Sequence, residues 1–176
     1  RCVYYPPISH IVADACPSAI RSFTISVALD HPARGGDGAL VARGNSNSGF
    51  VLYVKDGRLA FDYNAFHEHV LVRAARPLAA GKQSVEVRVA RAADRSAEVT
   101  LLAGGEAIGS GRIPRLLVLL SSTGMDLGRS LAPVNDDYEA PFAYPGRIET
   151  VTFEVAESAT PAEKSAEAEA KARAAM

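Results

Sequence analysis

The sequence predicts an all-β fold, an antiparallel sandwich or barrel, from three observations. About ten short segments have strand patterns, the turns between them are short, and no helical pattern appears before the C-terminal end. The last of these segments, 147–155, shows the pattern clearly, because Val151, Phe153 and Val155 alternate with polar residues. Such alternation is typical of a strand with one buried face. A series of strands without helices between them favours antiparallel sheets over βαβ units.

Size and composition restrict the classes of protein to consider. The chain has 176 residues, enough for one domain with a sizeable core, and its 48% hydrophobic and 22% charged content is ordinary for a globular protein. The net charge of −1 argues against a broad basic surface for nucleic acid or anionic lipid. No apolar run approaches the roughly 18 residues of a membrane helix. We therefore expect neither a nucleic-acid nor a membrane partner.

The first predicted strand is 22–30, where the apolar side chains fall on one face. These are Phe23, Ile25, Val27 and Leu29. A loop rich in glycine and proline follows, and 38–44 is the second predicted strand.

The central part of the chain predicts hairpins. Segments 50–55 and 58–63 flank Asp56-Gly57, a pair that favours a two-residue type I′ turn because both positions need positive φ. Gly104-Gly105 predicts a second tight turn. The nearly all-apolar segment 116–121 predicts a strand buried on both faces. The remaining predicted strands are 70–73, 83–90, 98–102, 106–111 and 147–155.

The chain changes character at Glu157. Thr160-Pro161-Ala162-Glu163 resembles a capping box, and Ala, Glu, Lys and Arg fill most of the rest. This segment has no large apolar face, so an isolated helix there would be marginal. We therefore divide the chain into a β-sandwich domain, 1–156, and a helical or disordered tail, 157–176. The start at Arg1, without a signal peptide, suggests a fragment or processed product.

Cysteine and histidine leave alternatives open. Cys2 and Cys16 are either ordinary small side chains or a disulfide, which would imply an oxidising compartment. His67-Glu68-His69 would put two imidazoles on one strand face, either as surface groups or as a metal-binding pair. A third ligand, such as Asp126 or Asp136, could be brought there only by the fold.

The acidic stretch Asp136-Asp137-Tyr138-Glu139 has the oxygen-rich composition of a calcium loop, but its spacing excludes an EF-hand. A solvated acidic turn is the alternative. We expect no metal and no cofactor.

No catalytic residues are predicted, because no nucleophile with an activating base is apparent and no Gly-x-Ser-x-Gly motif occurs. A carbohydrate-binding site is an alternative on a sandwich of this kind. Because tryptophan is absent, such a site would depend on tyrosines. The candidate binding residues are Tyr63, Asn64, His67 and His69, which are polar groups around one strand end.

Several motifs resemble, in order and spacing, the C-terminal region of large bacterial arylsulfatases over roughly 20–155. They include Gly49 to Leu59 with Phe61-Asp62-Tyr63-Asn64, Pro77-Leu78-Ala79-Ala80-Gly81-Lys82, Gly111-Arg112-Ile113-Pro114, Asp126-Leu127-Gly128, Pro133-Val134, Tyr138, Pro141-Phe142 and Gly146-Arg147-Ile148-Glu149-Thr150-Val151.

The resemblance implies a concanavalin A-like, jelly-roll β-sandwich that follows an α/β catalytic domain. The parent would hydrolyse sulfate esters in a bacterial cytoplasm or periplasm. This chain would be a non-catalytic accessory domain that packs on the parent's catalytic domain through an exposed apolar patch. The family's Cys-x-Pro-x-Arg nucleophile motif does not match Cys16-Pro17-Ser18-Ala19-Ile20-Arg21, so no catalytic residue carries over. The rival interpretation is a free-standing, lectin-like carbohydrate-binding module.

Overall fold

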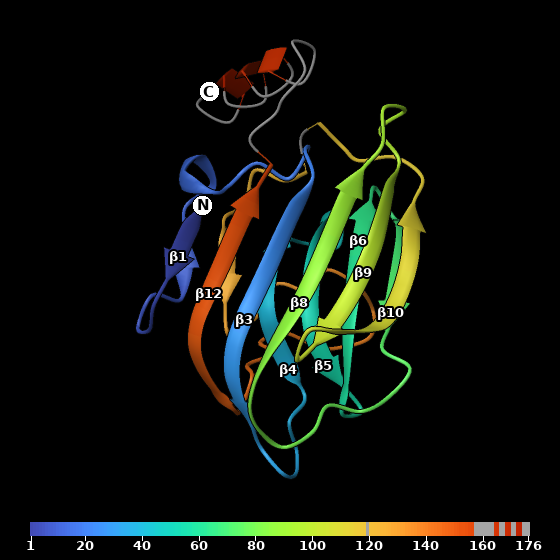
Figure 1. The fold of residues 1–176 in the computed structure, drawn as a ribbon. Helices are drawn as coiled ribbons and strands as arrows, with labels where there is room; N and C mark the ends of the chain where they lie inside the picture. The colour runs from blue at the N-terminus through green and yellow to red at the C-terminus, as the bar shows by residue number, and fades with distance from the viewer. Residues whose placement is uncertain (119, 157–163, 166–167, 170–171, 174–176) are drawn as a thin grey trace.

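In the computed structural model, two six-stranded antiparallel sheets lie face to face as a jelly-roll β-sandwich (Figure 1). The structure describes residues 1–118, 120–156, 164–165, 168–169 and 172–173. Sheet A has the order β1 (Cys2–Tyr4), β12 (Arg147–Val155), β3 (Phe23–His31), β8 (Gly81–Arg91), β9 (Ala97–Ala103) and β10 (Glu106–Ile113). Sheet B has the order β2 (His10–Ile11), β11 (Met125–Leu127), β4 (Gly38–Gly44), β5 (Ser48–Lys55), β6 (Arg58–Ala65) and β7 (Glu68–Arg73). A short 3₁₀ helix, Ala13–Ala15, follows β2.

The core lies between the sheets, where the apolar faces of the strands meet. In β3, buried and half-buried residues alternate along the whole strand, as the sequence predicts. Aromatic rings join the two layers: Phe23 stacks on Phe153 at 5.3 Å within sheet A and contacts Phe50 of β5 at 5.9 Å. Phe50 in turn contacts Phe61 of β6 at 5.9 Å. The core therefore crosses from one sheet to the other.

The two predicted tight turns are confirmed. Asp56 and Gly57 have φ of 52° and 71°, as a type I′ turn requires, and they join β5 to β6. Gly104 and Gly105 have φ of 57° and 84° and join β9 to β10. The all-β fold predicted from strand periodicity is confirmed with them, and of the two architectures that the pattern left open, sandwich or barrel, it is the sandwich.

Two local predictions need correction. The described residues of 116–121 form no strand; they form an irregular connection in which Leu116 and Leu120 are buried against the core. A run of apolar residues indicates that a segment is buried, but it does not indicate the backbone conformation, and for this reason the strand prediction was wrong. Strands β1, β2 and β11 were not predicted, because two or three residues are too few to show a period.

The predicted C-terminal tail, 157–176, lies mostly outside the described residues. Its six described residues, 164–165, 168–169 and 172–173, are helical and exposed. In the described part of the chain, no helix has the length and apolarity that crossing a membrane requires.

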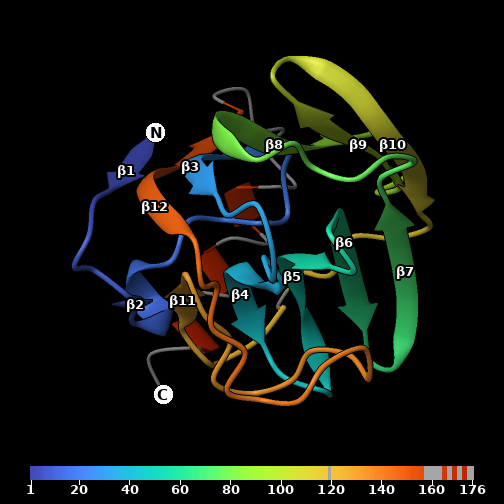
Figure 2. The same ribbon diagram turned by 90° about the horizontal axis from the view of Figure 1, so that it is seen from below.

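Sheet B is buried on both faces over β4, β5 and β6. Figure 2 shows the connection between β11 and β12, coloured orange, running along the face of sheet B that points away from sheet A. We call residues 128–146 the covering segment. Val134, Tyr138 and Phe142 from this segment pack on the outward-facing Val51 and Tyr53 of β5. Every residue of β5 except Lys55 is therefore buried.

Candidate functional site

Polar side chains gather on the outer face of sheet B, at the β6–β7 end. Strand alternation puts Leu59, Phe61 and Tyr63 of β6 into the core, so Asp62 and Asn64 between them face outward. On β7, the register pairs Asn64 with His69 and Ala60 with Arg73. Asp62, Asn64, His69 and Arg73 therefore share one face, and the covering segment lies against it.

Asn64 anchors the covering segment to the sheet. Its Nδ2 donates to the carbonyl oxygens of Val134 at 3.0 Å and Ser46 at 2.9 Å, and its Oδ1 accepts from the backbone N–H of His67 at 2.8 Å. The side chain is completely buried. Both ends of the amide are thus in use, and Asn64 holds the local backbone in place.

Asp62 is the buried acid at the centre of this face. Its Oδ2 accepts from Asn135 Nδ2 at 2.7 Å and lies 3.0 Å from His69 Nδ1. Burial raises the pKa of Asp62 above its ordinary value, although the hydrogen bonds from Asn135 and His69 oppose that rise. The carboxylate therefore fixes both the covering segment and the orientation of His69.

A second chain of contacts runs from Tyr53 to Arg73. The Tyr53 hydroxyl donates to Asp137 Oδ2 at 2.5 Å and accepts from Asn135 Nδ2 at 3.2 Å. Arg73 pairs with the same Asp137 oxygen. Burial, followed by the Asp137 carboxylate, raises the pKa of Tyr53, so this phenol stays protonated. We call Tyr53, Asp62, His69, Arg73, Asn135 and Asp137 the clamp network.

The structure separates the four sequence-predicted binding residues. Asn64 and His69 lie on the outer face. Tyr63 lies on the opposite face of β6, inside the core, where its hydroxyl accepts from the Leu117 N–H at 2.8 Å and burial raises its pKa to about 12. Tyr63 is therefore a core residue that a ligand outside the sandwich cannot contact. His67 is exposed in the turn before β7.

The prediction that His67 and His69 share one strand face is wrong. His67 lies outside β7 and has a left-handed φ of 71°, whereas His69 belongs to the strand. A turn placed between them breaks the period of two on which the prediction depended.

Among the described residues, no group of three or more His, Cys, Asp or Glu side chains is arranged so that it could hold a metal ion. The proposed third ligand Asp126 instead bonds His10 Nδ1 at 2.8 Å and the Leu131 N–H at 3.0 Å. Within the acidic stretch 136–139, the Asp137 carboxylate accepts a hydrogen bond from Tyr53 and pairs with Arg73. Cys2 and Cys16 are free thiols.

Sequence reasoning missed Tyr53, Arg73, Asn135 and Asp137 as members of one network. A partial signal exists in β6, where Asp62 lies between the apolar Phe61 and the aromatic Tyr63. Such a residue is exposed or is matched by a buried partner. The sequence could not say that the partner is Asn135, 73 positions later.

One solvent-accessible part of the outer face is a strip along β7. His69, Leu71 and Arg73 alternate with inward residues, so they project from the same side about 7 Å apart. Leu71 is 41% exposed. The flanking His69 and Arg73 are fixed by Asp62 and Asp137 respectively. We call these three residues the β7 strip.

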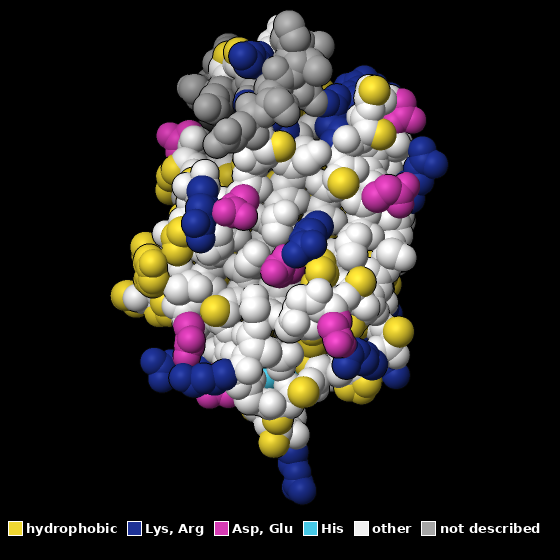
Figure 3. All heavy atoms as spheres, viewed as in Figure 1, with side chains coloured by type: hydrophobic (Ala, Val, Ile, Leu, Met, Phe, Trp, Pro, Cys, Tyr) yellow, Lys and Arg dark blue, Asp and Glu magenta, His cyan; other side chains and the backbone are white. Residues whose placement is uncertain are grey.

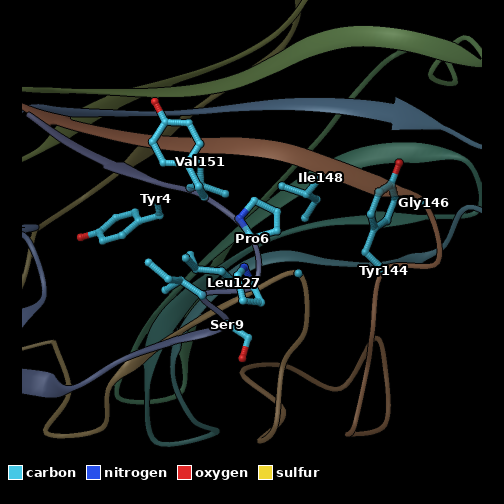
Figure 4. Close-up of a pocket in the computed structure, with 12 residues that line it drawn as sticks. Tyr4, Pro6, Ser9, Leu127, Tyr144, Gly146, Ile148 and Val151 are labelled. Carbon is cyan, nitrogen blue, oxygen red and sulfur yellow. The ribbon is translucent and has the colours of Figure 1, made fainter.

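A pocket of about 260 Å³ lies at the edge of the sandwich opposite β7. It is enclosed by the N-terminal segment and by residues of β11 and β12 (Figure 4). The N-terminal segment that forms one of its walls is rich in exposed apolar side chains. Four of the seven large hydrophobic side chains that are exposed in the described residues belong to positions 3–12; they are Val3, Tyr5, Ile8 and Val12. Figure 3 shows yellow apolar atoms gathered on this side of the molecule, at the left of the view.

Comparison with known proteins gives likeness in structure only. No family model and no curated protein matches the chain. A carbohydrate-binding module of family CBM40, from the Ruminococcus gnavus IT-sialidase and bound to α2,3-sialyllactose, aligns at a TM-score of 0.56 with 18% identity, over 85% of this chain and 83% of that one.

Two larger proteins contain a similar sandwich. The NanB sialidase of Streptococcus pneumoniae aligns at a TM-score of 0.63 with 15% identity, over 93% of this chain and 27% of that one. Domains LG4–5 of the mouse laminin α1 chain align at 0.60 with 16% identity, over 87% and 43%. At such identities the likeness establishes the fold: the chain is a jelly-roll β-sandwich similar to carbohydrate-binding modules and laminin G-like domains.

Proposed function

We propose that this chain is a non-catalytic carbohydrate-binding module whose contact surface includes the β7 strip. The observation that carries the proposal is the fixed arrangement of a hydrogen-bonding group, an apolar group and a cation along one open strand. His69 and Arg73 present polar groups to solvent, and Leu71 between them offers an apolar contact. Glycans present the same mixture of hydroxyls and apolar C–H faces.

Preorganisation supports the proposal. Asp62 orients His69 and Asp137 holds Arg73, so these side chains lose less freedom when a ligand binds than free surface side chains would. The fold supports it as well, since the similar Ruminococcus gnavus module was solved with a sialylated trisaccharide. Acidic glycans are therefore the first class to test, with Arg73 as the side chain that would attract their carboxylate or sulfate.

A glycan array of sialylated, sulfated and neutral oligosaccharides tests the proposal. We expect the wild-type chain to retain a subset of glycans, and Arg73→Ala and His69→Ala to weaken that retention about tenfold each. Arg88→Ala is the matched control, because Arg88 is an exposed arginine on the outer face of sheet A that pairs with Glu86. Unchanged binding by both β7 variants would remove the strip from the site, and no binding at all would reject the function.

We further propose, as a second candidate function, that the chain is the C-terminal accessory domain of an arylsulfatase-like parent. The sequence resemblance motivates it, and the concentration of exposed apolar side chains in residues 3–12 favours it, because an excised docking surface leaves such a patch. The sulfatase catalytic domain would be the partner in that case.

Mixing the chain with a separately expressed arylsulfatase catalytic fragment tests the second candidate. Association is expected to decrease with Val3→Ser and Val12→Ser, while Arg73→Ala has no effect. The absence of any association with the matching fragment would count against the accessory role and leave glycan binding untouched.

A further inference from the structure

The pocket beside the N-terminal segment is built from three parts of the chain that are far apart in sequence. Residues 4–9 form one wall, Leu127 and Gly128 another, and residues 144–151 the third. In the view of Figure 4, Tyr4 and Tyr144 lie toward opposite ends, with Pro6, Leu127 and Ile148 between them. No residue that lines the pocket belongs to the clamp network.

The lining of the pocket carries no charged side chain. Its twelve residues are Tyr4, Tyr5, Pro6, Pro7, Ile8, Ser9, Leu127, Gly128, Tyr144, Gly146, Ile148 and Val151. Aromatic, proline and aliphatic surfaces dominate, and the polar groups are the hydroxyls of serine and tyrosine together with the backbone. An anionic ligand would lose water here without gaining an opposite charge, which is costly. An uncharged ligand with hydroxyls has no such penalty.

The wall formed by Tyr144 is fixed before any ligand arrives. The Tyr144 hydroxyl lies 2.7 Å from His31 Nδ1, and the two rings stack at 6.0 Å. The Tyr144 N–H also donates to the Gly128 carbonyl at 3.0 Å. The ring lies so close to Gly146 that a Cβ there would meet Tyr144 Cε1 at 2.6 Å. A preformed wall reduces the entropy cost of binding.

Tyr5 lines the pocket and is also 59% exposed, so it offers aromatic surface that solvent and a ligand can reach. Aromatic rings contact the apolar C–H face of a sugar, and phenol hydroxyls can bond the sugar's hydroxyls. The volume, about 260 Å³, is just below the usual range for drug-sized ligands, so the pocket suits a single ring.

We propose that this pocket binds one uncharged pyranose ring, as a subsite separate from the β7 strip. The inference rests on the proposed glycan-binding function and extends it: the strip attracts an acidic residue, and the pocket selects a neutral one. Tyr5 and the neighbouring prolines contact the C–H face, and Ser9 and the backbone of the lining residues bond the ring hydroxyls.

Matched pairs of methyl glycosides test the charge selectivity. The methyl β-glycosides of glucose and galactose are titrated into the ¹⁵N-labelled full chain and followed by amide shifts, in parallel with the corresponding glucuronide and galacturonide. We expect at least one neutral glycoside to bind with a Kd of about 1 mM, and its uronide to bind at least about tenfold more weakly. The shifted amides should belong to residues 4–9, 127–128 and 144–151.

Three variants test the site itself. Tyr5→Ala should weaken binding of the neutral glycoside about tenfold, whereas Tyr5→Phe, which keeps the ring, should retain most of it. Val12→Ala is the matched control, because Val12 is an equally exposed apolar side chain (58%) of the same segment that does not line the pocket.

The outcomes separate this inference from the proposed function. If neutral glycosides shift amides of β7 and respond to His69→Ala but not Tyr5→Ala, the pocket proposal is wrong and the module still binds glycans. Equal affinity for glycoside and uronide would overturn the stated ligand class. If neither the glycosides nor an array glycan binds, both proposals fail.

Discussion

At the scale of single residues, buried polar side chains fix the arrangement of the outer face. Tyr53, Asp62 and Asn64 are each at most 1% exposed, and all bond side chains or backbone of residues outside their own strand. A buried polar group without a partner costs about 1–3 kcal/mol, so wrong positions of the covering segment are penalised. The main effect of these residues is therefore to select one position of the covering segment, and their contribution to the free energy of unfolding is secondary.

Replacement of Tyr53 tests the clamp network. Tyr53→Phe removes the hydroxyl that donates to Asp137 and accepts from Asn135, and leaves the Asn135 amide short of one partner. We expect a loss of about 1–2 kcal/mol in the free energy of unfolding, measured by urea denaturation. The control, Tyr5→Phe, removes a hydroxyl from a 59% exposed side chain and should change stability by less than about 0.5 kcal/mol. Equal effects would mean that the network is not formed in solution.

His31 predicts a pH dependence. Burial lowers the pKa of His31 below its ordinary value, against the opposing charge of Asp37. The unfolded chain therefore takes up this proton first as pH falls. The stability contribution is complete above the unfolded pKa of about 6.5 and is lost as pH falls below it toward the folded pKa, with a slope of at most about 1.4 kcal/mol per pH unit.

Unfolding of wild type and His31→Gln at pH 7.5 and 5.0 measures this contribution. The wild type should lose more stability over that interval than the variant. The comparison chain is His67→Gln, which removes an exposed histidine instead. A variant as pH-sensitive as the wild type would show that His31 is not the group responsible.

At the scale of elements, hairpin geometry depends on a few glycines. Gly44 ends β4 with φ of 101°, and a Cβ there would meet the Ser48 carbonyl oxygen at 2.1 Å. Gly35, in the loop before β4, also has positive φ, at 64°, but a Cβ at that position would have no atom within 4 Å. A substitution at Gly35 therefore introduces backbone strain alone, whereas a substitution at Gly44 introduces backbone strain and steric overlap.

Alanine at these two glycines should therefore have different costs. Gly35→Ala adds only the left-handed strain, about 1 kcal/mol, whereas Gly44→Ala also forces the β4–β5 connection apart and should cost at least about 2 kcal/mol more. Urea denaturation gives the values, and amide shifts in β4 and β5 should change only for Gly44→Ala. Similar costs at both positions would contradict the close approach of Gly44 to Ser48.

At the scale of the whole molecule, the two sheets are joined through the aromatic contacts of the core. Phe50 is completely buried and contacts Phe23 of sheet A and Phe61 of sheet B. Phe50→Ala should lower the free energy of unfolding by about 3–5 kcal/mol, because it leaves a cavity at the meeting of the layers. Phe66→Ala, at a residue that is 57% exposed, should stay within about 0.5 kcal/mol of wild type. If Phe50→Ala changed the free energy of unfolding only slightly, the contacts that join the two sheets would have to lie elsewhere in the core.

Much of the fold could be predicted because its signals are local. The alternation in 22–30 and 147–155 indicated strands β3 and β12 nearly to the residue, and Asp56-Gly57 indicated the turn between β5 and β6. Prediction failed at 116–121, where burial was mistaken for a strand, and at the two- and three-residue strands, which pairing creates and periodicity cannot show.

Local sequence patterns predict the class of fold and the inward face of most strands, because each of these depends on residues two to four positions apart. The alternation of β6 likewise separates Tyr63 from Asn64. Long-range folding, in contrast, is needed to bring Asn135 and Asp137 to Tyr53 and Asp62. Only it formed a pocket from residues 4–9, 127–128 and 144–151. The physical reason is that such sites are made by contacts between segments far apart in the chain, which leave no period in the sequence.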